Sequence, residues 1–354
     1  MKKRLLTVIC ALLLLCGCTR TEKLQNIIPQ ETETPVSADT MTIEDKVAQM
    51  LIACCCGADM DPILDKHPGG ILLFSVDFDD LSASEVKEKI NGFTEGAVIK
   101  PYIAVDEEGG TVVRVSSHSA LVPKKYESPR YYYTMGGISA IIDNTKEKSQ
   151  LLRSLGINMN LAPVADISQD PNDFMYERSL GADAATTAEY VSAVVQTSQK
   201  HGIAACLKHF PGYGGNVDTH TGIAVDDRSL DRFRANDFLP FSSGIAAGCT
   251  AVLVSHNIIT AVDDTEPASI SPDIHNILRD ELGFNGIIIT DDMSMGAMEG
   301  YDNAYARAVL AGNDMLIVSD FQAAYNEILA AVEDGTIPTD MIDTAVHRII
   351  TMKK

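Results

Sequence analysis

The chain has 354 residues, of which 45% are hydrophobic and 22% are charged, so it can bury a large core as one barrel-sized domain or two smaller ones. Its formal net charge of -21 argues against nucleic-acid binding, which needs a cationic surplus to neutralise phosphates. The same acidity argues against electrostatic attraction to anionic lipids, and we interpret it as a solubilising surface.

The first 18 residues follow the pattern of a bacterial export signal. A basic start at residues 2–4 precedes an apolar stretch at residues 5–15 that is too short to span a bilayer stably. The stretch ends in LCGC, which resembles a bacterial lipobox and implies removal of residues 1–17 and lipid attachment at Cys18. We therefore expect an extracytoplasmic protein anchored to the bacterial cell membrane by this lipid, with plain secretion as the alternative.

Residues 18–40 are rich in Thr, Glu, Gln, Pro and Ser and have no apolar periodicity, which is typical of a flexible tether. We expect folded structure from Met41 to the end of the chain, as one domain over residues 41–354. The eight cysteines are spread unevenly and do not form a disulfide framework. We interpret those beyond the leader as small buried hydrophobes.

Beyond Met41, short apolar runs alternate with amphipathic helical patterns. The runs are continuous, which indicates strands of a parallel sheet covered on both faces. Predicted strands lie at residues 47–56, 70–75, 102–105, 158–163, 203–209, 251–255, 286–290 and 315–318. Predicted helices lie at residues 82–96, 145–155, 184–201, 230–248, 271–282, 303–311, 322–332 and 339–352. About eight strand–helix units favour an α/β fold with a single (β/α)8 TIM-like barrel, although an open doubly wound sheet has a similar pattern.

Titratable residues follow almost every predicted strand. In a barrel of this kind, functional residues lie at the C-terminal ends of the strands. We therefore expect one polar pocket at the mouth of the barrel. The side chains that should meet there include Asp77, Asp106, Asp166, Lys208, His209, His256, Asp291 and Asp320.

The stretch at residues 203–222, IAACLKHFPGYGGNVDTHTG, begins as an apolar strand and breaks into a polar, glycine-rich loop. Lys208 and His209 lie at the strand end, and Asp218 and His220 at the far end of the loop. A Lys-His pair alone also fits an ordinary strand with a solvated loop. The whole stretch resembles the K-H-F-P-G-x-G…D-[ST]-H signature of family 3 glycoside hydrolases, in the branch of bacterial β-N-acetylglucosaminidases.

Further motifs similar to those of this family occur in the expected order. They are AVDEEGG at residues 104–110, GINMNLAPVAD at 156–166, RSLG at 178–181 and ITDDMSM at 289–295. The resemblance covers most of the chain after Met41 and implies a glycosidase on a barrel domain.

The resemblance implies three catalytic roles. Asp291 would be the nucleophile that forms a covalent glycosyl intermediate, although an acid at this place can also cap a helix, for which Asp292 is better placed. His220 would act as general acid and then as base, and its ordinary pKa of about 6.5 suits proton transfer near neutral pH. Asp218 would hold the His220 imidazole and favour its protonated form.

The resemblance also implies a set of contacts with the sugar. Asp106 would accept hydrogen bonds from hydroxyl groups distal to the bond that is cleaved. Arg114, Arg178, Lys208 and His209 resemble the remaining sugar contacts of the family. Both arginines could instead form ion pairs with the acids at the strand ends.

Two other acids have supporting roles in this interpretation. Asp166 would orient the cations, and Glu108 would be buried behind the site. No metal or redox cofactor is implied, because the sequence has no glycine-rich phosphate loop and His209 and His220 have no thiolate partners in the pattern.

The chain departs from the family pattern at several positions. Tyr213 stands where many members have histidine, and the segment at residues 208–220 is one residue shorter than in common members. Glu107 replaces a frequent glutamine, and Thr111 replaces a frequent arginine.

These observations favour a retaining exo-β-N-acetylglucosaminidase whose partner is a carbohydrate, such as a cell-wall fragment. One alternative is a β-glucosidase- or xylosidase-type member of the family, or a member that cleaves with phosphate. A second is a sugar-binding lipoprotein without catalysis, which the shortened loop and Tyr213 motivate. The acetamido preference rests on the family branch alone.

Overall fold

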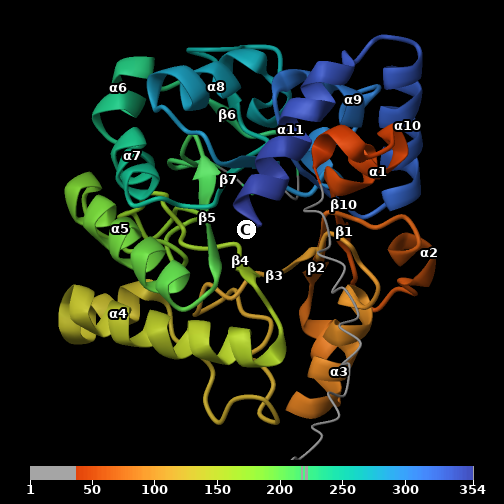
Figure 1. Ribbon diagram of the computed structural model, residues 1–354. Coiled ribbons are helices and arrows are strands. Elements are labelled where there is room, and N and C mark those ends of the chain that lie inside the picture. The colour runs from red at the N-terminus through yellow and green to blue at the C-terminus, as the bar shows by residue number, and fades with distance from the viewer. Residues whose placement is uncertain (1–36, 217, 220–221, 354) are drawn as a thin grey trace, which may run out of the picture. The chain divides into compact units, whose positions relative to one another are not determined.

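The computed structural model describes residues 37–216, 218–219 and 222–353 (Figure 1). The predicted export signal, Cys18 and most of the predicted tether lie outside this part of the chain. The first described element, the 3₁₀ turn η1 (Ala38–Thr40), comes directly before Met41. Within the described residues, no helix has the length and apolar character needed to cross a membrane.

Within the same residues, eight parallel strands form one sheet at the centre of the fold. They are β1 (Leu51–Cys54), β2 (Gly70–Leu73), β3 (Tyr102–Val105), β4 (Met159–Asn160), β5 (Ala204–Phe210), β7 (Ala251–Val254), β9 (Ile287–Thr290) and β10 (Leu316–Val318). The order is β10-β1-β2-β3-β4-β5-β7-β9. A parallel bridge between Ile289 and Met315 joins the two ends, so the sheet closes into the predicted (β/α)8 TIM-like barrel.

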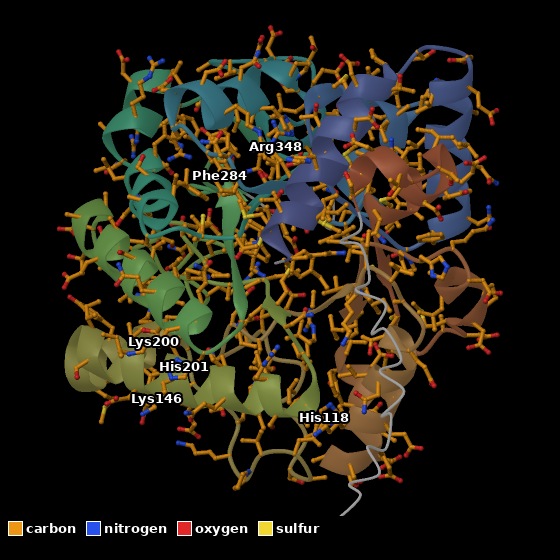
Figure 2. All side chains as sticks on the ribbon, in the orientation of Figure 1. His118, Lys146, Lys200, His201, Phe284 and Arg348 are labelled. Atoms are coloured by element: carbon orange, nitrogen blue, oxygen red, sulfur yellow. The ribbon has the colours of Figure 1, made fainter. Side chains whose placement is uncertain are left out.

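Helices surround the barrel, and most connect one strand to the next (Figure 1). They are α1 (Ile43–Gln49), α2 (Asp61–Leu64), α3 (Ala83–Thr94), α4 (Pro129–Leu155), α5 (Ala184–Lys200), α6 (Leu230–Ala235), α7 (Phe238–Ala246), α8 (Pro272–Asn276), α9 (Ala304–Ala311), α10 (Phe321–Glu333) and α11 (Thr339–Met352). Figure 2 shows Lys146 and Lys200, both exposed, on α4 and α5 at the edge of the molecule. A short pair, β6 (Val225–Asp226) and β8 (Ile258–Ile259), lies outside the barrel sheet.

Burial explains why the strands were recognisable in the sequence. Every barrel strand residue except Ala204 is buried, because side chains fill the barrel on one face and helices cover the other. The chain also passes very close to itself at Gly69. A Cβ atom there would lie 1.8 Å from the carbonyl oxygen of Gln49, so only glycine fits before β2.

Helix starts follow local capping chemistry. Ser82 and Glu85 form a capping box at the start of α3, and the Ser128 hydroxyl accepts from the Tyr131 N–H at the start of α4. Asp183 caps α5 in the same way. These caps satisfy main-chain N–H groups in the first turn of each helix, which have no partner within the helix.

Two predicted boundaries are wrong because one apolar run spans two elements. The predicted strand at residues 47–56 begins in the last turn of α1, and β1 starts only at Leu51. The predicted helix at residues 230–248 is two helices, since the backbone leaves the helical conformation at Asn236. Apolar periodicity cannot separate such neighbours when no glycine or proline marks the junction.

The helix predicted from residue 145 in fact begins sixteen residues earlier, at Pro129. Its first half contains Gly136 and Gly137, both with non-helical backbone angles, and α4 is kinked there. Glycines lower helix propensity, which hid the first half of α4 from sequence analysis.

The N-terminal end of the barrel is closed by stabilising contacts. Lys353, directly after α11, donates from Nζ to the carbonyl oxygen of Gly69 at 2.8 Å. Nearby on the same end of β10, the buried Asp314 binds Arg279 at 2.5 Å and Arg348 at 2.8 Å, and Figure 2 shows Arg348 projecting from α11. The opposite, C-terminal end of the strands is the end that bears the polar residues.

Candidate active site

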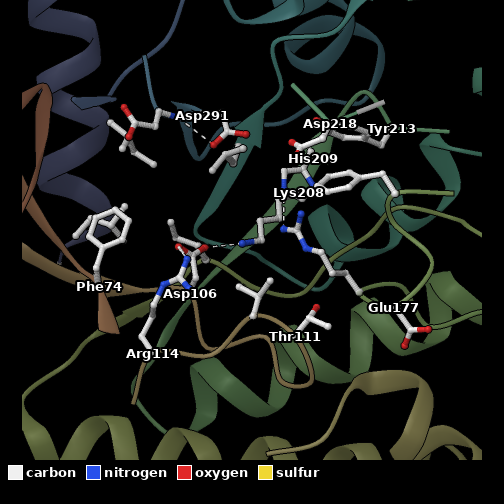
Figure 3. A pocket seen from close by; sticks show the side chains of 18 residues that line it. Phe74, Asp106, Thr111, Arg114, Glu177, Lys208, His209, Tyr213, Asp218 and Asp291 are labelled. Carbon is white, nitrogen blue, oxygen red and sulfur yellow. Dashed lines mark hydrogen bonds and ion pairs between the residues drawn. The ribbon is translucent and has the colours of Figure 1, made fainter. Parts of the chain in front are cut away.

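A cavity of about 590 Å³ opens at the C-terminal ends of the barrel strands (Figure 3). It is lined by all five predicted sugar contacts, Asp106, Arg114, Arg178, Lys208 and His209, and by Asp218, Asp291 and Asp292. Lys208 and His209 lie in β5, and the other residues come from the loops that follow β3, β4, β5 and β9. The sequence prediction of one shared pocket is therefore confirmed for Asp106, Lys208, His209 and Asp291. His220 lies outside the described part of the chain. The prediction is wrong for four other strand-end residues, which do not line this cavity: Asp77, Asp166, His256 and Asp320.

Buried opposite charges alternate along one wall of the cavity. Lys208 Nζ lies 2.6 Å from a carboxylate oxygen of Asp106 and 2.6 Å from one of Glu108. Arg178 binds Glu108 with two nitrogens, at 2.7 and 3.0 Å, and Arg114 lies 3.5 Å from Asp106. Both arginines thus form the predicted alternative ion pairs and line the cavity as well.

The charges hold one another in the ionised state. Burial by itself would raise the pKa of Asp106 and Glu108, but the neighbouring cations outweigh it and hold both pKa values below their usual range. Burial likewise opposes the charge on Lys208, yet Asp106 and Glu108 raise its pKa above the usual value. The wall therefore presents fixed charges at neutral pH, and the predicted position of Glu108 behind the site is confirmed.

His209 is oriented from both sides of its ring. Its Nδ1 lies 2.7 Å from Asp166 Oδ2, and its main-chain N–H donates to the same oxygen at 3.0 Å. Its Nε2 lies 3.2 Å from Nη2 of Arg178. An arginine can only donate, so Nε2 accepts and the ring proton resides on Nδ1, facing Asp166. Asp166 thus orients His209 as a supporting acid.

Two adjacent acids follow β9 and have different surroundings. The main-chain N–H of Asp291 donates to the Val254 carbonyl at 3.0 Å, which ties its backbone to β7. The Asp292 carboxylate accepts from the N–H and hydroxyl of Ser294, both at 2.9 Å, and from the Ser319 hydroxyl at 3.2 Å. Asp292 is therefore engaged in holding its own turn. In Figure 3, Asp291 faces the cavity across from Asp106.

Two buried residues for which sequence analysis predicted no role support the wall. Glu107 is fully buried, and its carboxylate accepts from the main-chain N–H groups of Arg114 at 2.8 Å and Val115 at 2.7 Å. Lys148 on α4 donates from Nζ to the Glu108 carbonyl at 2.7 Å, and burial lowers the pKa of its ammonium to about 8. Lys148 could have been noticed in the sequence as a charged residue on the apolar face of α4.

Aromatic rings form part of the cavity edge. Phe74, after β2, lies under the Arg114 guanidinium at 5.6 Å, and Phe174 lies 5.7 Å from that of Arg178. Tyr213 packs on Phe174 with ring centroids 5.6 Å apart. Phe174 belongs to an irregular loop, where sequence analysis had no strand end to point to it. Among the described residues, no group of three or more His, Cys, Asp or Glu side chains could hold a metal ion.

The contacts of Glu108 give a testable expectation for stability. Glu108→Gln removes the negative charge that compensates the cations of Lys208 and Arg178. We therefore expect the free energy of unfolding at pH 7 to fall by about 3–5 kcal/mol. A carboxylate whose pKa is lowered on folding stabilises the fold fully above its ordinary pKa of about 4.3 and loses this effect as pH falls below it. Urea unfolding should therefore show the difference between variant and natural protein shrinking between about pH 5 and pH 3.

Glu177→Gln is the matched control, since Glu177 is exposed at the rim of the same cavity. We expect this change to alter the free energy of unfolding by less than about 0.5 kcal/mol. A difference for Glu108→Gln that stays constant over the acidic range would contradict the charge-pair account.

Comparison with known proteins agrees with this geometry. Residues 42–352 match the glycosyl hydrolase family 3 N-terminal domain. β-Hexosaminidase LpqI of Mycobacterium tuberculosis is 31% identical over 325 residues, which cover 87% of this chain and 82% of the relative. A β-hexosaminidase of Stenotrophomonas maltophilia is 33% identical over 277 residues, which cover 76% of this chain and 81% of the relative.

Solved structures give the same result. The structure of M. tuberculosis LpqI superposes with a TM-score of 0.83 at 28% identity and covers 91% of this chain and 97% of LpqI. A family 3 β-N-acetylglucosaminidase from Paenibacillus sp. FPU-7 gives a TM-score of 0.82 at 30% identity over 88% of this chain, which spans 62% of that structure. The fold, the strand-end residues and these relatives together establish that the chain belongs to glycoside hydrolase family 3.

Proposed function

We propose that the protein is a retaining exo-β-N-acetylglucosaminidase that removes terminal β-linked N-acetylglucosamine through a covalent bond to Asp291. The observation that carries this proposal is the convergence of Asp291 with Asp106, Lys208 and Arg178 on one cavity of about 590 Å³. The β-hexosaminidase names of relatives at 31% and 33% identity support the acetamido sugar.

The shape of the cavity suits the end of a glycan. Its inner lining comes from apolar side chains at the strand ends, Leu72, Leu161, Leu253 and Ile317, beneath which the barrel is packed. A terminal sugar can enter from the open side and rest on this floor.

The charged wall suits the hydroxyl groups of the sugar. In the proposed complex, Asp106 accepts hydrogen bonds from hydroxyl groups, and Arg114, Arg178 and Lys208 donate to oxygen atoms. Because the charges already pair with one another, the sugar enters a site whose side chains are held in place before it binds. These side chains then lose little conformational freedom when the sugar binds, which lowers the entropic cost of binding.

The proposed reaction has two steps. In the first, the Asp291 carboxylate bonds to the anomeric carbon, the bond to the glycosidic oxygen breaks, and that oxygen takes a proton from His220. In the second, the neutral His220 takes a proton from water, whose oxygen bonds to the anomeric carbon and releases the Asp291 carboxylate. Asp218 stabilises the imidazolium form of His220, which is present before the first step and is restored by the second, whereas the ring is neutral between the steps.

Matched 4-nitrophenyl β-glycosides test the substrate. With the fragment that starts at Met41, we expect the N-acetylglucosaminide to be hydrolysed at least about tenfold more efficiently than the glucoside, a difference of about 1.4 kcal/mol in transition-state binding. Preference for the glucoside would overturn the acetamido assignment.

Measuring the rate in phosphate and in a non-nucleophilic buffer, with a search for sugar 1-phosphate, distinguishes hydrolysis from phosphorolysis.

Replacing the proposed nucleophile tests the mechanism. Asp291→Asn should lower kcat by roughly 10³-fold or more, which corresponds to about 4 kcal/mol, because no covalent intermediate can form. Asp320→Asn is the control, since Asp320 also follows a barrel strand but is exposed and caps α10, which asparagine can do equally well. Equal activity of the two variants would rule out Asp291 as the nucleophile.

We also propose that the lipid anchor predicted at Cys18 places the enzyme outside the bacterial cell membrane, where cell-wall fragments are the accessible substrate. The support is the lipobox-like LCGC sequence that ends the apolar leader. In a bacterial host, the full chain should fractionate with membranes and the Cys18→Ala chain should not. Membrane association of both chains to the same extent would contradict the anchor.

A further inference from the structure

Tyr213 links the start of the β5–β6 loop, which comprises residues 211–224, to Thr219 in the middle of the same loop. Its main-chain N–H donates to Asp166 at 2.7 Å, close to the end of β5. Its hydroxyl lies 2.6 Å from the Thr219 hydroxyl and accepts from the Thr219 main-chain N–H at 3.0 Å. One residue therefore connects the wall of the barrel, through its main chain, to the middle of the loop, through its side chain.

Thr219 is the residue between Asp218 and His220. We propose that Tyr213 is a positioning residue for proton transfer, because it holds Thr219, which lies in the sequence between the two residues proposed to transfer the proton. This inference rests on the function proposed above, in which Asp218 and His220 form the proton-transfer pair. It concerns the position where many family members have histidine and where the loop is one residue shorter.

The barrel side of this link is rigid. Tyr213 is only 2% exposed, and its ring lies edge-on to that of His209, with centroids 5.5 Å apart and an interplanar angle of 75°. Asp166, which accepts from the Tyr213 N–H, also accepts from the main chain and ring of His209. The Tyr213 ring cannot move without disturbing these contacts in the cavity wall.

The loop side of the link is held from two directions. Thr219 is fully buried, and its carbonyl accepts from the Ala297 N–H at 3.2 Å in the segment after β9. Inside the loop, the Asn216 side-chain amide donates to the Tyr213 carbonyl and to Asp226, both at 2.9 Å. Thr219 thus joins the β5–β6 loop to the segment that follows the proposed nucleophile.

The chemical consequence concerns geometry. A general acid must lie within hydrogen-bond reach of the leaving oxygen, and a displacement of about 1 Å can cost on the order of 10²-fold in rate. Burial raises the pKa of the Tyr213 phenol to about 12, so its hydroxyl stays neutral while an imidazole titrates. The link should therefore keep the same hydrogen bonds throughout the pH range of activity.

The test is Tyr213→Phe, which removes the hydroxyl and keeps the ring packing. For an N-acetylglucosaminide with a poor leaving group, such as phenyl, we expect kcat/KM to fall by roughly 30- to 100-fold. For the 2,4-dinitrophenyl substrate, whose leaving group needs little protonation, kcat/KM should fall by less than about threefold. Both substrates present the same sugar, so a loss of sugar binding would lower both values together.

The second step of the proposed reaction, the attack of water on the glycosyl intermediate, gives an independent test of the positioning role. The kcat of Tyr213→Phe on the 2,4-dinitrophenyl substrate should be limited by the attack of water, which needs the general base. Azide attacks the anomeric carbon without giving up a proton, releases the Asp291 carboxylate and forms a glycosyl azide. We expect azide to raise this kcat at least about tenfold in the variant and to change the natural enzyme little.

Two further variants complete the experiment. Thr219→Val removes the other hydroxyl of the pair and should show the same dependence on the leaving group, while Thr219→Ser should stay close to the natural enzyme. Tyr102→Phe is the control, because the Tyr102 hydroxyl is buried at the opposite end of the barrel and has no hydrogen-bond partner among the residues that the structure describes. Its rates should be unchanged for both substrates.

Equal losses on both substrates, or no loss, in both Tyr213→Phe and Thr219→Val would overturn the positioning role while leaving the proposed function intact. Absence of turnover of either substrate by the natural enzyme would instead overturn the proposed function, and this inference with it.

Discussion

The site depends on the alternation of buried charge from Asp106 through Lys208 and Glu108 to Arg178. Lys208 and Glu108 are buried, Asp106 and Arg178 are partly exposed to the cavity, and partners at 2.6–2.7 Å compensate each charge. Such pairs add little net stability, since desolvation offsets their attraction, but loss of one partner leaves an uncompensated charge. Their contribution is a fixed arrangement, because each side chain has one low-energy position that satisfies its neighbours.

The barrel makes this arrangement possible with short segments of chain. Asp106 and Glu108 follow β3, and Lys208 lies near the end of β5. Arg178 comes from the loop after β4, and β4 is the strand between β3 and β5 in the sheet. Neighbouring parallel strands end at the same edge, so residues 102 positions apart in sequence meet without long excursions. Glu107 and Lys148 then fix the loop backbone from behind, which keeps the charged wall rigid although it lies on loops.

The barrel and residues that line its mouth could be predicted from the sequence, because continuous apolar strands and polar strand ends are local signals. It could not decide whether Arg178 contacts Glu108, the sugar or both, since pairing depends on distances across three strands. It missed the first half of α4, where Gly136 and Gly137 weaken the helical pattern. Phe174 had no local signal, because its place at the cavity edge follows from the path of an irregular loop.

Ion pairs hold the side chains of the cavity wall, and hydrogen bonds between neutral groups hold the β5–β6 loop. The wall that faces the sugar uses ion pairs, which suit groups that never change protonation near neutral pH. The β5–β6 loop must support residues proposed to gain and lose a proton, and ion pairs there would change strength with each step. The Tyr213–Thr219 pair avoids this coupling, because two neutral hydroxyl groups keep their hydrogen bonds whatever the charge beside them. A tyrosine in place of histidine at residue 213 thus removes one titrating group from the loop without removing its support.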